Sequence, residues 1–277
     1  MADVAGNNCN ASGDAGQGRP DELRAMKNKR FVFVGGLHRS GTSLLARCIS
    51  EHPKVSGFLN TGVPQDEGQH LQGVYRPARD HGGPGRFGFD PDAHLTEASP
   101  LVSQQNRARL MSDWGRYWDT RKEVLLEKSP PNLIRTRFLQ ALFPDAYFVM
   151  IIRHPIAVAY ATQKWSRTDV PSLIEHWAVC HEIFKADRPH IRRLLVVRYE
   201  DLVARPQATL DNVFSFLGVD SVACEVEINP DVNAGYLRKW CEDSSGVSPG
   251  GASKVGVDLN AYARRVAALG YELNPNA

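Results

Sequence analysis

The sequence has no apolar run near the ~18 residues that a membrane-spanning helix needs, and its N-terminus has no apolar core of a secretory signal. We therefore predict a cytoplasmic protein without a membrane span. Cysteine is also scarce, because the chain has five cysteines and they are scattered without paired spacing. Such a set excludes a disulfide framework and a zinc site. Cys48 and Cys180 fall in apolar helical patterns and are expected to be buried thiols.

Charge of one sign is lacking as well. The 33 lysines and arginines nearly balance the 31 aspartates and glutamates, so the formal net charge is only +2. This balance argues against nucleic acid as the main partner, and places the basic residues near a local anionic ligand instead. With 277 residues and 42% hydrophobic content, the chain suits one large α/β domain, which we assign to residues 29–277. Residues 1–28 are rich in Ala, Gly, Asn and Asp without periodicity, which predicts a disordered leader.

What the chain does contain is a strand, turn and helix pattern at residues 31–53. Residues 31–34 are an unbroken apolar run, typical of a strand buried on both faces. Apolar residues then recur at helical spacing until Pro53, which should end the helix. The turn between them is rich in glycine and hydroxyl side chains and carries Arg39. Such a turn directs N–H groups and a helix N-terminus to one point, where a phosphate binds; a tight turn without a ligand is the alternative.

This turn departs from the nucleotide loop of NTPases. Gly36 and Gly41 have the Walker A spacing, but Thr42 stands where that loop has its lysine. The cation of the turn is instead Arg39, two residues before the second glycine. An NTPase without the lysine lacks the contact that neutralises the β- and γ-phosphates. The turn therefore suits a ligand with a single terminal phosphate.

Two further cations follow predicted strands. Lys128 comes after the apolar run at residues 124–126, and Arg153 comes after the apolar run at residues 147–152. A Walker B strand would end in an acid that holds magnesium, whereas an arginine before a helix N-terminus is a bidentate phosphate ligand. The alternative for Arg153 is a surface ion pair.

Strands alternate with helices along the chain, so we predict an α/β three-layer sandwich with a mostly parallel central sheet. Ligands of such sheets bind outside the carboxyl ends of the strands, where Arg39, Lys128, Arg153 and Tyr199 should converge. Helices are predicted at residues 103–117, 134–143 (capped by Asn132), 173–184, 206–217 and 257–269, with a fourth strand at 194–197. The stretches 79–92 and 244–253 are expected to be irregular loops, the first of them a lid or a substrate loop.

Several of these segments resemble one known family. Residues 37–45 resemble the 5′-phosphosulfate loop, Pro-(Arg/Lys)-Ser-Gly-Thr-(Thr/Ser), of sulfotransferases that use 3′-phosphoadenosine 5′-phosphosulfate (PAPS). Residues 127–130 and 199–202 resemble that family's Glu-Lys-(Ser/Thr)-Pro and Tyr-Glu-Asp-Leu segments, and residues 232–240 resemble its nucleotide-closing segment. The match is closer to the carbohydrate, tyrosylprotein and bacterial branch than to the small-phenol branch.

The resemblance implies a P-loop NTPase-like fold and in-line transfer of a sulfuryl group from PAPS to a hydroxyl or amine, with no metal required. The acceptor would be a small molecule, a carbohydrate or a peptide. The family's 3′-phosphate arginine is followed eight residues on by a serine, but Ala161 stands there in this chain. Thr162 replaces that serine only if the helix is slightly rotated.

The resemblance also implies a role for individual residues. The 5′-phosphosulfate would be held by Arg39, Ser40, Gly41, Thr42 and Ser43, the 3′-phosphate by Arg153 and Thr162, and the bridging or sulfuryl oxygens by Lys128. Tyr199 would either line the adenosine pocket or pack in the core.

An acceptor hydroxyl or amine must lose a proton, so a general base is needed. In the family this base is a Glu or His just after the first helix and second strand, where the chain has residues 66–70. Glu67 is the first candidate and His70 the second, and a solvated polar loop is the alternative for each. Two other functions stay open: a nucleotide kinase or NTPase, and a non-catalytic nucleotide-binding module in which Ala161 marks a degenerate site.

Overall fold

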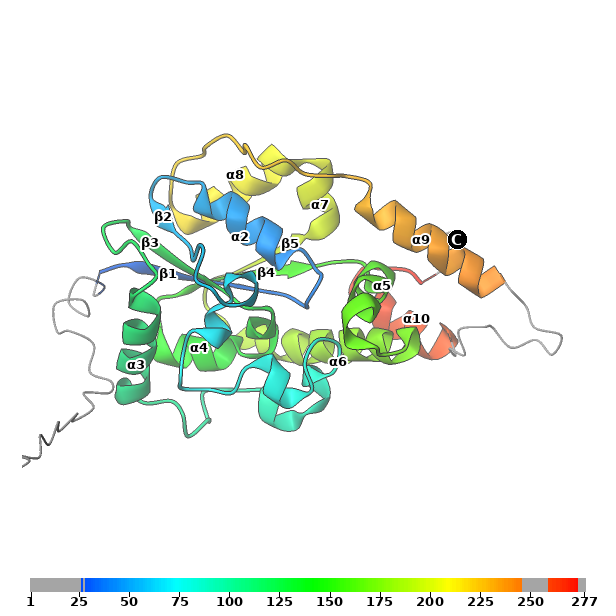
Figure 1. The fold of residues 1–277 in the computed structure, drawn as a ribbon, viewed down its shortest axis with the longest axis horizontal. Coiled ribbons are helices and arrows are strands. Elements are labelled where there is room, and N and C mark those ends of the chain that lie inside the picture. Colours follow the sequence, from blue (N-terminus) through cyan, green and yellow to red (C-terminus); the bar gives the residue numbers. More distant parts are fainter. Residues whose placement is uncertain (1–25, 27, 246–258, 274–277) are drawn as a thin grey trace, which may run out of the picture.

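The fold is built on a parallel β-sheet of five strands, seen in a computed structural model that describes Met26, residues 28–245 and residues 259–273 (Figure 1). The strand order is β2-β3-β1-β4-β5. The strands are β1 Arg30–Gly35, β2 Val55–Ser56, β3 Val124–Lys128, β4 Tyr147–Ile152 and β5 Leu194–Arg198. Every pairing is parallel, so the predicted α/β fold with a parallel sheet is confirmed.

Helices cover both faces of the sheet, which makes the three predicted layers (Figure 1). In that view α2, α7 and α8 lie above the sheet, whereas α3, α4 and α6 lie below it. The helices are α2 Thr42–Ser50, α3 Gln104–Gly115, α4 Thr136–Leu142, α5 Pro155–Ser166, α6 Val170–Asp187, α7 Tyr199–Ala204, α8 Pro206–Leu217, α9 Val232–Ser245 and α10 Leu259–Ala267.

Alternation along β1 separates two hydrophobic cores. Phe31 and Phe33 point into the core that includes α3, α4 and α6, while Val32 and Val34 point into the core under α2 and α8. Successive side chains of a strand leave the sheet on opposite faces, so an unbroken apolar run fills both cores. The sheet is thereby fixed rigidly between two helical layers.

The registers bring the carboxyl ends of the strands to one edge. Val34 pairs with Lys128, Gly35 with Met150, and the last residues of β4 and β5 pair with each other. The loops that follow β1, β3, β4 and β5 therefore leave the sheet side by side. This is the edge at which ligands of open parallel sheets bind.

Two local predictions differ from the structure. Asn132 does not cap a helix; Arg135 precedes α4, and Asn132 Nδ2 donates instead to Val34 O at 3.1 Å and to Glu127 Oε2 at 2.5 Å. Asn132 lies inside the short 3-10 helix Pro130–Ile134, and its amide is oriented by Glu127 and Val34, so tertiary contacts override the local capping preference. Helix α2 also ends at Ser50 rather than continuing to Pro53.

The Gly- and Pro-rich stretch at residues 79–92 is packed against the rest of the domain. Short 3-10 helices run through it, at Ala78–His81, Phe87–Phe89 and Pro91–Ala93. His81 Nδ1 lies 2.6 Å from Asp90 Oδ2, and the backbone N–H of Gly88 donates to His176 Nε2 on α6. These contacts tie the stretch to itself and to α6.

Some predictions fall partly outside the described residues. These are the leader at 1–28, of which only Met26 and Asn28 are described, most of the loop at 244–253 and the start of the helix at 257–269. Met26 itself is fully buried. Cys48 and Cys180 are buried free thiols, as predicted. Within the described part of the chain, no helix is long and apolar enough to cross a membrane.

Candidate active site

A cavity of about 460 Å³ opens at the carboxyl edge of the sheet. Residues from widely separated parts of the chain line it, from His38 to Val232, so residues far apart in sequence meet there. Its lining contains nine of the predicted site residues, namely Arg39, Gly41, Thr42, Ser43, Glu67, His70, Arg153, Thr162 and Tyr199. The other two lie at its border: Ser40 is buried inside the turn after β1, and Lys128 bonds to Ser43 beside the cavity.

The turn after β1 takes a shape that directs its amides outward. Arg39 has a φ of 69° and Gly41 a φ of 96°, both in the left-handed region. A Cβ at Gly41 would lie 2.6 Å from the Tyr199 ring, so only glycine fits there. Helix α2 then begins at Thr42 without an acidic residue in its first turn. The first N–H groups of a helix have no intrahelical acceptor, and here they belong to Thr42, Ser43 and Leu44, which line the cavity.

Several buried polar atoms around this cavity have no hydrogen-bond partner among the described residues. Three of them are hydroxyl or guanidinium donors, Ser40 Oγ, Thr162 Oγ1 and Arg153 Nη2, and two are imidazole nitrogens, the Nδ1 atoms of His38 and His70. Buried polar groups are normally hydrogen-bonded, so three orphaned donors near one cavity fit an anionic ligand that carries acceptor oxygens. Thr162, and not Ala161, lines the cavity.

Arg153 is held by two contacts with the protein, which leave one of its terminal nitrogens free. Its Nε donates to Asn233 Oδ1 and its Nη1 to the carbonyl of Arg39, both at 2.8 Å. The guanidinium carbon lies 4.0 Å from the centre of the Tyr199 ring. Tyr199 lines the cavity and also packs in the hydrophobic core under α2 and α8. Burial lowers the pKa of Arg153, but an arginine stays charged in proteins. A buried cation with one free Nη2 is therefore aimed at the cavity.

Glu200 fixes the surroundings of Arg153. Its Oε1 accepts from the backbone N–H of His154 at 3.0 Å and from Asn233 Nδ2 at 2.9 Å. Its Oε2 accepts from the Tyr271 hydroxyl at 2.8 Å. The carboxylate thus joins β4, α9 and the C-terminal segment, which is a structural role.

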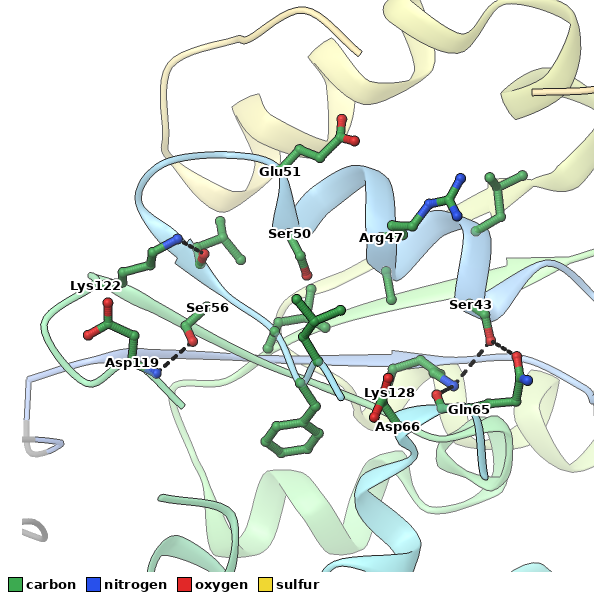
Figure 2. Close-up of a pocket in the computed structure, with 17 residues that line it drawn as sticks. Ser43, Arg47, Ser50, Glu51, Ser56, Gln65, Asp66, Asp119, Lys122 and Lys128 are labelled. Atoms are coloured by element: carbon green, nitrogen blue, oxygen red, sulfur yellow. Dashed lines mark hydrogen bonds between the residues drawn. The ribbon is translucent and has the colours of Figure 1, made fainter. Parts of the chain in front are cut away.

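Lys128 lies beside Ser43 of the turn at residues 36–43, which we call the anion loop, and beside Gln65 (Figure 2). Its Nζ donates to Gln65 O at 2.6 Å and to Ser43 Oγ at 3.2 Å, and lies 3.5 Å from Glu67 Oε1. Burial lowers the pKa of Lys128, while the neighbouring carboxylate of Glu67 opposes that shift. A second cavity of about 880 Å³ adjoins on the other side of Ser43, Gln65 and Lys128.

Glu67 and His70 meet in the first cavity. Glu67 is 6% exposed, and its Oε2 lies 3.7 Å from His70 Nε2. Burial raises the pKa of Glu67, while Lys128 opposes that shift. Burial, with Arg79 second, lowers the pKa of His70. Relative to their ordinary values, the carboxylate becomes a stronger base and the imidazole a weaker one.

Several polar lining residues had escaped the sequence prediction, among them His38, Gln65, Gln69 and Arg79. His38 precedes Arg39 in the anion loop, lines the cavity and packs edge-on against Phe87; burial, Lys128 and His70 lower its pKa to about 3, so its ring is neutral. Its place in the loop was an available signal. Gln65 and Gln69 had no such signal in the sequence, because what distinguishes them is their hydrogen bonds to Lys128 and Ser129.

The charge of the lining is positive. Among its described residues, three arginines, Arg39, Arg79 and Arg153, stand against one carboxylate, Glu67. No group of three or more potential metal ligands occurs in the described part of the chain. The cavity is thus shaped for an anion that backbone amides, arginines and hydroxyl groups hold.

The model of the sulfotransferase family matches residues 32–223. The chain belongs to the sulfotransferase family. The match covers β1 through α8 and so includes the anion loop, Lys128, Arg153 and Tyr199. The resemblance noted in the sequence is thereby confirmed at the level of the family.

Curated relatives of the chain include animal and bacterial proteins. It is 24% identical over 208 residues to protein-tyrosine sulfotransferase 2 of Gallus gallus, covering 72% of this chain and 53% of that protein. It is 25% identical over 217 residues to nodulation protein NoeE of Sinorhizobium fredii, covering 69% and 50%. The chain therefore spans about half the length of these curated relatives.

Solved structures share the fold. The sulfotransferase STF9 of Mycobacterium avium has a TM-score of 0.54 at 13% identity, with 90% of this chain and 78% of that chain covered. The sulfotransferase domain of the Synechococcus PCC 7002 olefin synthase has a TM-score of 0.52 at 20% identity, with 90% and 97% covered. These matches confirm the P-loop-like three-layer architecture.

Proposed function

We propose that the protein transfers a sulfuryl group from PAPS to a hydroxyl or amine acceptor. The observation that carries this proposal is the cavity with Ser40 Oγ, Thr162 Oγ1 and Arg153 Nη2 left without protein partners beside the N-terminus of α2. PAPS carries a phosphosulfate at one end and a 3′-phosphate at the other. The oxygens of these two groups can accept hydrogen bonds from the unpartnered side chains and from the helix N-terminus. Bound PAPS supplies the sulfuryl group and leaves as adenosine 3′,5′-bisphosphate.

The anion loop holds the reacting end of the donor in this proposal. Arg39 and the amides at the N-terminus of α2 would bind the 5′-phosphosulfate, together with the hydroxyl groups of Ser40, Thr42 and Ser43. Arg153 and Thr162 would bind the 3′-phosphate. Two anchors at opposite ends of a nucleotide fix its orientation, which is the main requirement of in-line transfer.

Lys128 and Glu67 serve the chemical step. The Lys128 ammonium, which reaches Ser43 Oγ, would stabilise negative charge on the bridging or sulfuryl oxygens. Glu67 would take the proton of the acceptor, with His70 as the second candidate. Glu67 Oε1 lies 3.5 Å from Lys128 Nζ, so the candidate base and the charge-stabilising lysine are neighbours.

The acceptor class is part of the proposal. One curated relative is named a protein-tyrosine sulfotransferase and another a nodulation protein. These names support a small-molecule, carbohydrate or peptide acceptor. The absence of a nucleic-acid partner, the independence from metal and the cytoplasmic location stay predictions of the sequence. An NTPase is disfavoured because Thr42 replaces the Walker lysine.

The proposal is tested by mixing the full chain with sulfur-labelled PAPS and a metabolite extract, a set of glycans and a set of tyrosine peptides. Label should appear in one acceptor pool and adenosine 3′,5′-bisphosphate should form in equal amount. Lys128→Met should lose this activity by roughly 10²-fold or more, the scale of a lost electrostatic contact in the transition state. Transfer of phosphate from ATP without any sulfuryl transfer would contradict the proposal.

A further inference from the structure

The side chain of Gln69 connects the candidate base to the sheet. Gln69 is 1% exposed and lies in the 3-10 helix Gly68–His70, directly after Glu67. Its Nε2 donates to Glu67 Oε2 at 2.5 Å. We propose that Gln69 is a positioning residue that orients the Glu67 carboxylate and favours its ionised form, an inference that rests on the function proposed for Glu67.

The orientation of the Gln69 amide is fixed by a second contact. Gln69 Oε1 accepts the backbone N–H of Ala78 at 2.8 Å. If the amide were turned over, its NH₂ group would face that N–H donor, and the carbonyl would face the Glu67 carboxylate. Both contacts would then be repulsive. The donor group of Gln69 is therefore held on Glu67.

The backbone of Gln69 is anchored to the sheet by a buried chain of hydrogen bonds. Its N–H donates to Ser129 Oγ at 2.8 Å, and that hydroxyl donates to Glu127 Oε1 at 2.6 Å. The second oxygen of Glu127 accepts from Asn132, which also donates to Val34 O on β1. These hydrogen bonds connect the candidate base to β1 and β3 rather than to a loop. Functional groups that are anchored to strands are held in place more precisely than groups on loops.

The two oxygens of Glu67 have different neighbours as a result. Oε2 is engaged by Gln69, while Oε1 faces Lys128 Nζ at 3.5 Å. Oε1 therefore lies beside the cation to which the charge-stabilising role is assigned above. A rotated carboxylate would lose this arrangement, because Gln69 and Lys128 engage different oxygens of it.

The hydrogen bond from Gln69 also affects the pKa of Glu67. Burial raises the pKa of Glu67, and Lys128 and the hydrogen bond from Gln69 oppose that rise. The titratable groups that interact with Glu67 are Lys128 and Glu127 from β3 and His70 from its own segment. Removal of the Gln69 donor takes away one of the two stabilising contacts, so the pKa of Glu67 should rise further.

The test compares pH profiles of kcat/KM for the wild type, Gln69→Met and Gln69→Glu. Both variants should shift the acid limb to higher pH, by roughly one pH unit for Gln69→Met, because a hydrogen bond to a charged group is lost. Gln69→Glu keeps an acceptor for Ala78 and a similar volume, and adds a like charge beside Glu67, so its shift should be larger. KM for PAPS should stay within about twofold in both.

Gln72→Met is the matched control. Gln72 lies in the same segment, and its amide bonds only to backbone groups of residues 69, 74 and 75. This variant should lower thermal stability but leave the acid limb in place. An acid limb that stays fixed in both Gln69 variants, or moves equally in Gln72→Met, would overturn the positioning role.

A second readout is independent of activity. In protein labelled with ¹³C at the glutamate carboxyl, the resonance that vanishes in Glu67→Gln reports the titration of Glu67. That titration should move to higher pH in Gln69→Met. A moved titration in a protein that transfers no sulfuryl group would support the contact and contradict the proposed function. An unmoved titration in an active enzyme would contradict the contact alone.

Discussion

Several ionisable side chains at the carboxyl edge of the sheet are buried, and burial destabilises their charged forms. Burial raises the pKa of Glu127 to about 7, and burial lowers the pKa of Lys128. Such opposed shifts in neighbouring groups are typical of catalytic centres, although structural ion pairs also produce them. Glu67 lies within reach of Lys128 and so experiences both the buried environment and a compensating cation.

The base can be assigned by two isosteric substitutions. Glu67→Gln keeps the shape and removes the basicity, so turnover should fall by roughly 10²–10⁴-fold, the usual contribution of general-base catalysis. PAPS affinity should hardly change, because the base acts on the acceptor in the transition state. His70→Asn should have the smaller effect in the same steady-state assay. The reverse order of severity would make His70 the base, and normal turnover in both variants would place the base elsewhere.

Arg153 is expected to recognise the 3′-phosphate. Arg153→Ala should weaken adenosine 3′,5′-bisphosphate by about 1.5–3 kcal/mol, the scale of a hydrogen bond to a charged group, which corresponds to roughly 10–150-fold in Kd. Isothermal titration calorimetry measures this change. Adenosine 5′-phosphosulfate, which has no 3′-phosphate, serves as the internal control and should bind almost unchanged. Equal weakening of both ligands would show that Arg153 is not at the 3′-phosphate.

At the scale of elements, the site depends on how tightly the N-terminus of α2 approaches α7. Gly41 combines a left-handed φ of 96° with a position where a Cβ would meet the Tyr199 ring at 2.6 Å. Gly41→Ala should therefore displace the anion loop and weaken adenosine 3′,5′-bisphosphate at least tenfold in calorimetry. The backbone strain itself costs roughly 1–2 kcal/mol of stability.

A matched glycine separates strain from displacement. Gly83 has a φ of 78°, and a Cβ there would meet no atom within 4 Å. Gly83→Ala should therefore show a similar loss in the free energy of unfolding, measured by denaturant titration, with nucleotide affinity unchanged. Comparable losses of affinity in both variants would mean that strain alone, and not the contact with Tyr199, explains the effect.

The elements near the site differ in how far the sequence predicts them. The anion loop, Lys128 and Arg153 were predictable because each follows an apolar strand, and parallel strands bring such positions to one edge. The hydrogen bonds from Gln69 to Ser129 and from Asn132 to Glu127 were not, since their partners are chosen by tertiary packing. Asn132 was wrongly predicted as a helix cap for that reason. Local pattern thus specifies where the cations lie, but not which buried groups orient the base.

The whole molecule has almost no net charge, yet its ligand cavity is lined mainly by cations. The formal net charge is +2, while Arg39, Arg79 and Arg153 face one cavity with Glu67 as the carboxylate among its described lining. Recognition of an anion is therefore local, and long-range attraction contributes little. Affinity should come from the shaped contacts at the two ends of the nucleotide.

Nucleotide binding should accordingly stabilise the entire domain without a metal. A ligand at about 100 times its Kd stabilises the native state by ~2.7 kcal/mol, which for a domain of this size raises Tm by roughly 5–10 °C. Adenosine 3′,5′-bisphosphate should give this shift equally with magnesium and with a chelator, because the contacts expected for it are amides, hydroxyl groups and arginines. ATP with magnesium should give a smaller shift, since Thr42 stands in place of the lysine that a triphosphate requires. A larger shift from ATP with magnesium in differential scanning fluorimetry would favour an NTPase over a sulfotransferase.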